Sequence, residues 1–400
     1  MIYAGIPIVL TFFLKIKKQT FGKRLLAFLL TLALFLPLYA LPYFVDGKKN
    51  TIAGKKLVEP FFAPTSIYRN TYGVLKKKIV KRSIPLAKRR KIEELFPFDL
   101  DEETKDFTFV LVIGESTRGD HLSINGYDRL TTPKLEKRTN LISYTNATSC
   151  SARTVFSVAC LLSHLPMVEF SLPLKDTSAI SVMKSLGFKT FFLSNHLHKG
   201  RSNCEEADVC FMHNEKNKVL EGGTANKFDL SLLELMAHTS GNFVGNKFIV
   251  LHTMGSHANY NNRVPDDRFR QFRPICDKAS LYNCSTEELN NSYDNSILYV
   301  DEFLDQLFNK LDDEKAMVLF ASDHGESLGE KGVYLHSKPN FLAPSAQRDI
   351  PLVFWGSKGV EFSEGLKQRM AQRVLSVPID HDTIFHSILD CSGVSGDLVD

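Results

Sequence analysis

Short, uninterrupted apolar runs followed by polar or charged residues dominate the pattern of the chain after residue 106. Three of them, residues 107–113, 248–251 and 317–321, have the length and the β-branched and aromatic content of buried strands. Residues 155–163 have the pattern of a helix that begins after a stretch rich in serine and threonine. This combination favours an α/β domain built on an open sheet, in which ligands bind beyond the carboxyl ends of the strands.

Residues 25–45 differ from these runs, because they are apolar throughout and carry no charge. About 20 such residues suffice to cross a bilayer, so we predict a transmembrane helix; a cleaved signal peptide is the alternative. The preceding loop, residues 15–24, has five positive charges and no negative one, which predicts a cytoplasmic loop and export of everything after Val45. Residues 1–14 are apolar but short, and we expect them to be the tail of another membrane helix.

The chain is therefore expected to have three parts: a membrane region at residues 1–45, a juxtamembrane linker with basic amphipathic helices at 46–106, and an exported catalytic domain at 107–400. The net charge is only +4, but residues 76–91 hold nine Lys and Arg without an acid. Anionic lipid headgroups are one expected partner for this run, and a solvated linker is the alternative. Nucleic acid is not expected, because an exported chain rarely meets it.

Six of the seven cysteines fall in close pairs, which is informative about the compartment. In an exported domain such pairs predict local disulfides, whereas zinc knuckles would need tighter C-x-x-C spacing. Cys391 is left over. The expected pairs are Cys150–Cys160, Cys204–Cys210 and Cys276–Cys284.

Candidate metal ligands follow two of the predicted strands. Glu115 comes just after residues 107–113, and Asp323 and His324 come just after residues 317–321. Two carboxylates and an imidazole, with a position left open, form the ligand set of a catalytic zinc or similar ion. A helix cap or a turn is the simpler explanation for one Asp-His pair, but Glu326 follows at a distance suited to orient an imidazole.

Two further histidines, His257 and His336, lie in glycine-flanked loops that should meet the same crevice. A nucleophilic oxygen is expected nearby, since a covalent intermediate divides a difficult displacement into two steps. The start of the helix predicted at 155–163 would favour an incoming phosphoryl oxygen. The hydroxyls there are either the nucleophile or ordinary helix caps, and the candidates are Thr148, Ser149, Ser151 and Thr154.

Four long motifs in the same order resemble the phosphoethanolamine transferases of Gram-negative bacteria, the family of lipid A modifiers and mobile colistin-resistance enzymes. They are GESTRGDHLSINGYDRLTTPKL, TSCSARTVFSVACLLS, HTMGSHANY and SDHGESLGEKGVYLHSKPN. The resemblance covers the chain from about Phe107 onward and implies an alkaline-phosphatase/sulfatase-like fold, with a mostly parallel central sheet and helices on both faces. The family commonly has five transmembrane helices, so the N-terminus of this chain is expected to be a truncated or divergent form.

The resemblance also implies residue roles. Zinc would be held by Glu115, Thr154, Asp323 and His324, with Thr154 as the nucleophile. His257 and His336 would bind substrate or a second, weaker zinc, and SNHLHKG places phosphate-contacting residues at Asn195 and Lys199. The family's disulfides fall on the three cysteine pairs. Arg153 departs from the family pattern, in which a small or polar residue precedes the nucleophile.

The implied reaction moves phosphoethanolamine from phosphatidylethanolamine to lipid A, lipopolysaccharide core or a periplasmic glycan. We expect a monomer in the bacterial inner membrane with its catalytic domain in the periplasm. Alternatives are a sulfatase, whose C-x-P-x-R motif Cys150-Ser151-Ala152-Arg153 lacks, and a phosphoglycerol transferase, which should lack the cysteine pairs. An inactive membrane-anchored scaffold is the third, although every expected ligand is present.

Overall fold

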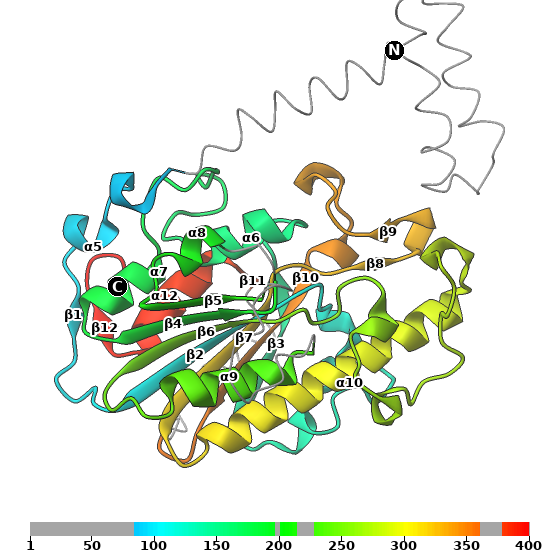
Figure 1. Ribbon diagram of the computed structural model, residues 1–400. Coiled ribbons are helices and arrows are strands. Elements are labelled where there is room, and N and C mark those ends of the chain that lie inside the picture. Colours follow the sequence, from blue (N-terminus) through cyan, green and yellow to red (C-terminus); the bar gives the residue numbers. More distant parts are fainter. Residues whose placement is uncertain (1–83, 197–200, 214–227, 361–377, 400) are drawn as a thin grey trace, which may run out of the picture. The chain divides into compact units, whose positions relative to one another are not determined.

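The computed structural model describes residues 84–196, 201–213, 228–360 and 378–399. Residues from Ser83 to Asp400 form one compact unit, and its centre is an eight-stranded sheet with helices on both faces (Figure 1). In spatial order the strands are β11 (Ile379–Asp380), β3 (Leu141–Thr148), β10 (Asp349–Gly356), β7 (Lys315–Ser322), β2 (Phe107–Gly114), β6 (Lys247–His252), β4 (Lys189–Ser194) and β5 (Val209–Met212).

Only β10 runs against its neighbours, so the sheet is mostly parallel. The predicted α/β architecture is confirmed. Two small antiparallel pairs lie outside it, β1 (Asp99–Leu100) with β12 (Val394–Ser395) and β8 (Ser327–Leu328) with β9 (Tyr334–Leu335). The three predicted strands correspond to β2, β6 and β7, and the predicted helix corresponds to α6 (Thr154–Leu161).

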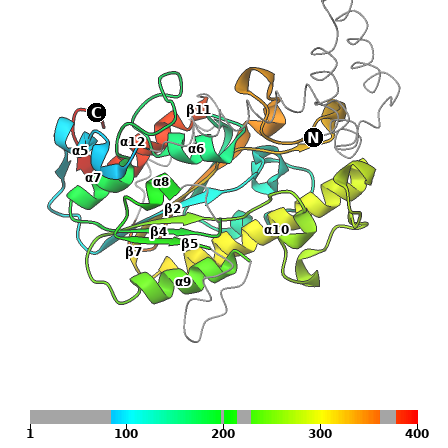
Figure 2. The same cartoon turned by 45° about the horizontal axis from the view of Figure 1, so that its top comes forward.

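The helices divide between the two faces of the sheet. Apolar side chains of α6, α7 (Ala179–Ser185) and α12 (Asp382–Cys391) share one buried core with the sheet, and those of α9 (Leu230–Ser240) and α10 (Thr286–Leu311) share the other. Two short helices, α5 (Ile92–Leu95) and α8 (Arg201–Cys204), complete the described set. Figure 2 shows the same two layers after rotation, with α9 and α10 beneath the sheet. The strands are buried on both sides, which explains why their sequences are apolar without alternation.

Strand register brings the candidate residues together. Gly114 of β2 pairs with Ser322 of β7, and His252 of β6 pairs with both Ile113 of β2 and Ser194 of β4. The four parallel strands β2, β4, β6 and β7 therefore have their carboxyl ends at the same level. The residues that follow them emerge at one edge of the sheet, the usual ligand position in open α/β folds.

Residues 84–106 correct one expected boundary, because they pack on the domain instead of forming part of a linker. β1 pairs with β12 near the carboxyl terminus, and Arg90 bridges to Asp176. Arg89, from the basic run, is buried and forms an ion pair with Glu206. Short polar segments of this kind have no periodicity, so the sequence pattern alone could not distinguish docking from exposure to solvent.

Among the described residues, no helix combines the length and the apolar character needed to cross a membrane. The helix predicted at residues 25–45 lies outside them. The structure pairs the cysteines as Cys150–Cys160, Cys204–Cys210 and Cys276–Cys284, and Cys391 is free.

Candidate active site

Glu115 lies at the centre of the site, directly after β2, and its side chain is fully buried. The loop after β6 approaches its backbone so closely that a Cβ on Gly255 would lie 2.6 Å from the carbonyl oxygen of Glu115. Gly255 also has a φ of +43°, in the left-handed region that glycine adopts without strain. Close contact between the two loops therefore depends on glycine at this position.

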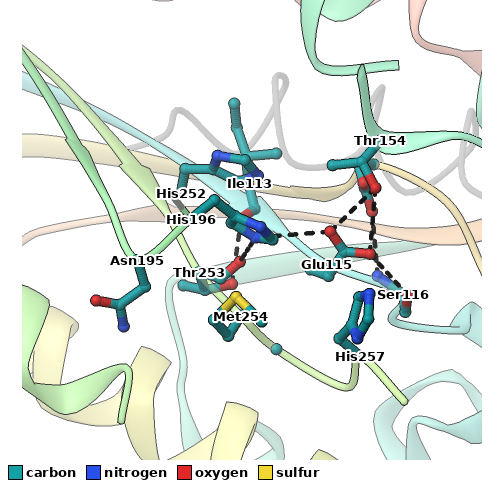
Figure 3. Close-up of polar contacts among 12 residues, drawn as sticks. Ile113, Glu115, Ser116, Thr154, Asn195, His196, His252, Thr253, Met254 and His257 are labelled. Atoms are coloured by element: carbon teal, nitrogen blue, oxygen red, sulfur yellow. Dashed lines mark hydrogen bonds and ion pairs between the residues drawn. The ribbon is translucent and has the colours of Figure 1, made fainter. Parts of the chain in front are cut away.

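Thr154 is the first residue of α6, and its hydroxyl points at Glu115 (Figure 3). Its Oγ1 lies 3.1 Å from Glu115 Oε2 and 3.1 Å from His324 Nε2. Of the other hydroxyl candidates, Ser149 donates its hydroxyl to the backbone carbonyl of Ser151 in their own loop. Thr154 is thus the candidate that the fold brings against the acidic and imidazole groups.

His324 presents an unprotonated nitrogen to this cluster. Its Nδ1 lies 2.9 Å from the carbonyl oxygen of Gly325, so Nδ1 carries the proton and Nε2 has the lone pair. Burial lowers the pKa of His324 to about 4, which keeps the ring neutral at physiological pH. Asp323 Oδ2 lies 3.4 Å from the same Nε2, and its other oxygen accepts from the backbone N–H of Ser116.

His336 reaches the site from the end of β9. Its Nδ1 is 2.6 Å from Glu326 Oε2, which agrees with the expectation that Glu326 orients an imidazole. Burial opposes the protonated ring, but the hydrogen bond and the charge of Glu326 outweigh it and raise the pKa of His336. His257 stands next to it, with ring centres 5.3 Å apart, so the structure brings the two histidines together as expected.

Two buried histidines were not selected from the sequence. His196 follows β4, with Nε2 3.5 Å from Glu115 Oε2 and 2.8 Å from the carbonyl oxygen of Thr253. Its ring stacks on His252, the last residue of β6, at 4.1 Å. The available signal was the short apolar run at residues 191–193 of β4, followed after Ser194 by Asn-His at the same edge of the sheet.

Asn195 does not face the site. Its amide donates to Asp229 at 2.7 Å, and Figure 3 shows the side chain directed away from Glu115. Asp229 also accepts from the backbone N–H groups of Met254 and Gly255, so Asn195 supports the loop after β6. The phosphate-contacting role expected for Asn195 is therefore not what its contacts indicate. Lys199 lies outside the described residues.

His381 connects the segment before Thr154 to the end of β7, and no motif or pattern along the chain singles it out. Its Nδ1 accepts from the backbone N–H of Cys150 at 3.3 Å, and its Nε2 donates to the carbonyl of Ser322 at 3.0 Å. Burial lowers its pKa to about 4, so the ring stays neutral and keeps this tautomer. The segment before Thr154 is thereby fixed to the end of β7.

Within the part of the chain that the structure describes, two groups of donor atoms, buried except for the partly buried His336, could hold a metal ion. Glu115, His324 and His336 have ligand atoms within 4.8 Å of one another, and so do Glu115, His196 and His252. Carboxylate oxygens with neutral imidazole nitrogens are the donors that zinc prefers in catalytic sites. The first group shares Glu115 and His324 with the ligand set expected from the sequence, and it contains His336, which was expected to bind substrate or a second zinc.

A family model described as Sulfatase matches residues 108–394. Phosphoethanolamine transferase EptA of Salmonella typhimurium is 30% identical over 401 residues, an alignment that covers 96% of this chain and 72% of the relative. The chain belongs to the phosphoethanolamine transferase family. Phosphatidylethanolamine transferase Mcr-1 of Escherichia coli is another relative, 29% identical over 98% of this chain and 74% of its own length.

The fold of a solved member of the phosphoethanolamine transferase family agrees with this assignment. The integral membrane lipooligosaccharide phosphoethanolamine transferase A from Neisseria meningitidis has a TM-score of 0.72 at 27% identity, and the match covers 98% of this chain and 73% of that one. In the present family member the Cys150–Cys160 disulfide links the segment before Thr154 to the second half of α6. Because Cys150 precedes Thr154 and Cys160 follows it in α6, this disulfide restrains the first turns of the helix that carries the nucleophile candidate.

Proposed function

We propose that the protein is a zinc-dependent transferase that moves phosphoethanolamine from phosphatidylethanolamine to an envelope acceptor through a phosphothreonine-type intermediate on Thr154. The observation that carries this proposal is the position of Thr154 Oγ1, 3.1 Å from both Glu115 Oε2 and His324 Nε2. A hydroxyl between a carboxylate and an unprotonated imidazole nitrogen is placed for deprotonation and metal contact together.

Zinc fits the residues at this position. The ligands would be Glu115, Thr154, Asp323 and His324, all buried, with carboxylate, alkoxide and neutral imidazole donors. A zinc ion bound there would stabilise the negative charge on the Thr154 oxygen and on the phosphoryl group. A second, weaker zinc at His257 and His336, whose rings are adjacent, is the alternative to the proton-donating and charge-supplying roles given to them below, because a protonated imidazole cannot bind zinc.

In the first half-reaction Thr154 Oγ1 attacks phosphorus of the donor lipid. An Oγ1–P bond forms, the bond from phosphorus to the glycerol oxygen breaks, and diacylglycerol leaves. The hydroxyl proton departs by way of Glu115, its hydrogen-bond acceptor, and the glycerol oxygen gains a proton. His336 is suited to supply that proton, because its pairing with Glu326 favours the protonated ring.

In the second half-reaction an oxygen of the acceptor attacks the same phosphorus from the side that diacylglycerol has left. A proton on the attacking acceptor oxygen passes to His336, which lost one in the first half-reaction. The Oγ1–P bond breaks, Thr154 recovers its proton from Glu115, and the acceptor carries phosphoethanolamine. Positioning and electrostatic stabilisation provide most of the rate enhancement in phosphoryl transfer. His257 and His336 would supply positive charge next to the phosphoryl oxygens, with Lys199 retained as a candidate from the sequence.

The names of relatives support the choice of substrates. Mcr-1 of Escherichia coli is called a phosphatidylethanolamine transferase, and another relative from Salmonella typhimurium is a Kdo(2)-lipid A phosphoethanolamine 7''-transferase. We propose the same donor and a lipid A or related glycolipid acceptor for this chain. We also propose an inner-membrane anchor at residues 1–45 and a periplasmic catalytic domain, which the three disulfides suit.

A sulfatase activity, the main alternative within the superfamily, is disfavoured by the position of Cys150. The sulfatase mechanism needs this cysteine as the modified nucleophile, but here it is bonded to Cys160, and Thr154 occupies the position beside Glu115.

Diacylglycerol release from phosphatidylethanolamine vesicles, measured with purified full-length protein of known zinc content, tests the proposal. We expect release that stops when zinc is chelated and resumes when zinc is restored. Thr154→Ala should abolish it while leaving most zinc bound. Undiminished release by Thr154→Ala, or sulfate ester hydrolysis without lipid turnover, would contradict the proposal.

A further inference from the structure

Large apolar side chains are exposed beside the proposed nucleophile. Val155, which follows Thr154 on α6, is 57% exposed, and Phe341 and Leu342 are 85% and 62% exposed. Phe341 and Leu342 are consecutive residues of a single 3₁₀ turn, Asn340–Leu342. Two adjacent apolar side chains at the tip of a turn are costly to leave in water, and such groups commonly mark an interaction site.

The turn stands next to the segment that leads into α6. The backbone N–H of Ser337 donates to the carbonyl of Ala152 at 2.7 Å, and the Asn340 amide donates to the carbonyl of Cys150 at 2.6 Å. Figures 1 and 2 both show this part of the chain, between β9 and β10, alongside α6. We call Val155, Phe341 and Leu342 the apolar rim of the site.

Two basic residues adjoin the apolar rim. Arg153 comes two residues before Val155 and Lys338 three residues before Phe341, and both are exposed. Apolar tips flanked by basic side chains complement a phospholipid surface, which offers acyl chains below a layer of phosphates and anionic headgroups.

We propose that the apolar rim docks the catalytic domain on the phospholipid bilayer, with Phe341 and Leu342 inserted among the acyl chains and Arg153 and Lys338 against the lipid phosphates. This inference rests on the proposed function, because it gives the donor lipid a short path from the bilayer to Thr154. A protein partner or a second copy of the chain would also cover apolar side chains, but neither accounts for basic residues next to an apolar rim beside a nucleophile whose donor is a lipid.

Fluorescence quenching by brominated lipids tests the docking in the full-length protein. The chain has a single tryptophan, Trp355, which is 3% exposed and stacked on Phe308 in the core. Phe341→Trp therefore adds one reporter in the rim. Val244→Trp is the matched control, since Val244 is 84% exposed and precedes β6, at the strand end opposite the site.

In vesicles of phosphatidylethanolamine and phosphatidylglycerol with brominated acyl chains, we expect the emission of Phe341→Trp to fall at least twofold. Val244→Trp and the wild-type chain should keep their emission. Equal quenching of both added tryptophans, or quenching of neither, would overturn the proposal. Emission from Phe341→Trp that changes with protein concentration in detergent, without lipid, would point to a second copy instead and also overturn it.

A kinetic comparison separates this inference from the proposed function. The double variant Phe341→Ser/Leu342→Ser should lower the ratio of kcat/KM on bilayer donor to kcat/KM on a monomeric short-chain donor by at least about tenfold, since burial of even one of these apolar side chains has an effect of about that size. Val244→Ser should leave the ratio unchanged. An unchanged ratio in the double variant overturns the docking while wild-type transfer still upholds the function. Quenching without any transfer would reject the function alone.

Discussion

Arg89 is expected to fix residues 84–106 to the catalytic domain, and its loss should destabilise the whole unit. The guanidinium is almost fully buried, and its NH1 donates to Glu206 Oε1 at 2.7 Å and to the carbonyl of Ser202 at 3.0 Å. Glu206 lies in the loop closed by the Cys204–Cys210 disulfide. Replacing Arg89 by methionine keeps much of the volume and removes the charge.

The expected loss of stability in Arg89→Met follows from the Glu206 carboxylate, which remains buried. Without Arg89, the Glu206 carboxylate stays buried with three hydroxyl or amide donors from Ser178 and Ser181, but with no opposite charge in contact. Removing one partner of a buried ion pair typically costs about 3–5 kcal/mol, more than the pair itself contributes. At about 2 °C per kcal/mol for a large domain, the melting temperature should fall by about 6–10 °C.

Trp355 fluorescence during thermal or denaturant unfolding in detergent measures this loss, because the tryptophan lies in the core. Adding Glu206→Gln to Arg89→Met should recover part of the stability, since the unpaired charge is gone. Arg90→Met is the control: its ion pair with Asp176 is largely exposed on the arginine side and should matter far less. An Arg89→Met variant as stable as the wild type, or no coupling in the double variant, would refute the assignment of residues 84–106 to the domain.

Three further outcomes are expected. Glu115→Ala should lower zinc affinity by at least about tenfold, because one of a few buried ligands is lost, and elemental analysis after dialysis should show less zinc per chain than in the wild type; full occupancy would remove Glu115 from the ligand set. His381→Ala should lower kcat about tenfold, with zinc retained and KM little changed. His381→Asn should recover part of the lost kcat, because its side-chain oxygen can again accept from the backbone N–H of Cys150. Equal activity of both variants and the wild type would reject this positioning role. Burial raises the pKa of Asp301 to about 7, so the native state keeps a proton that the unfolded chain loses near pH 4. The free energy of unfolding should therefore fall as pH rises from about 4 to 7, and Asp301→Asn should make it depend less on pH. An equally steep pH dependence in Asp301→Asn would assign it to other groups.

The centre of the fold was predictable because buried strands leave a clear signal. β2, β6 and β7 are buried on both faces, so their sequences are continuous apolar runs without alternating polar residues. The polar residues that follow these runs were expected at the carboxyl edge of the sheet. The register that aligns Gly114 with Ser322 then brings Glu115 to His324. The proximity of Glu115 and His324 could be predicted from the sequence because parallel strands of similar length end at the same edge of a sheet.

Features that depend on contacts across the fold could not be predicted in the same way. The sequence pattern does not single out His196, because β4 is short and has polar residues at both ends. A local motif favours the neighbouring Asn195 for phosphate contact, but the Asn195 amide bonds to Asp229. His381 acts through a backbone N–H and a carbonyl more than 50 residues away, and such bonds leave no pattern in the sequence. The docking of residues 84–106 rests on one buried ion pair inside a basic run that otherwise suggested exposure.

Mass spectrometry of the peptide that contains Thr154, after brief incubation of the full-length enzyme with phosphatidylethanolamine and no acceptor, tests the central claim most directly. The proposed mechanism predicts a phosphoethanolamine mass on Thr154, formed together with diacylglycerol and discharged when acceptor is added. The same adduct on Ser151 or Thr117, or sustained diacylglycerol release with Thr154 unmodified and Thr154→Ala still active, would contradict it.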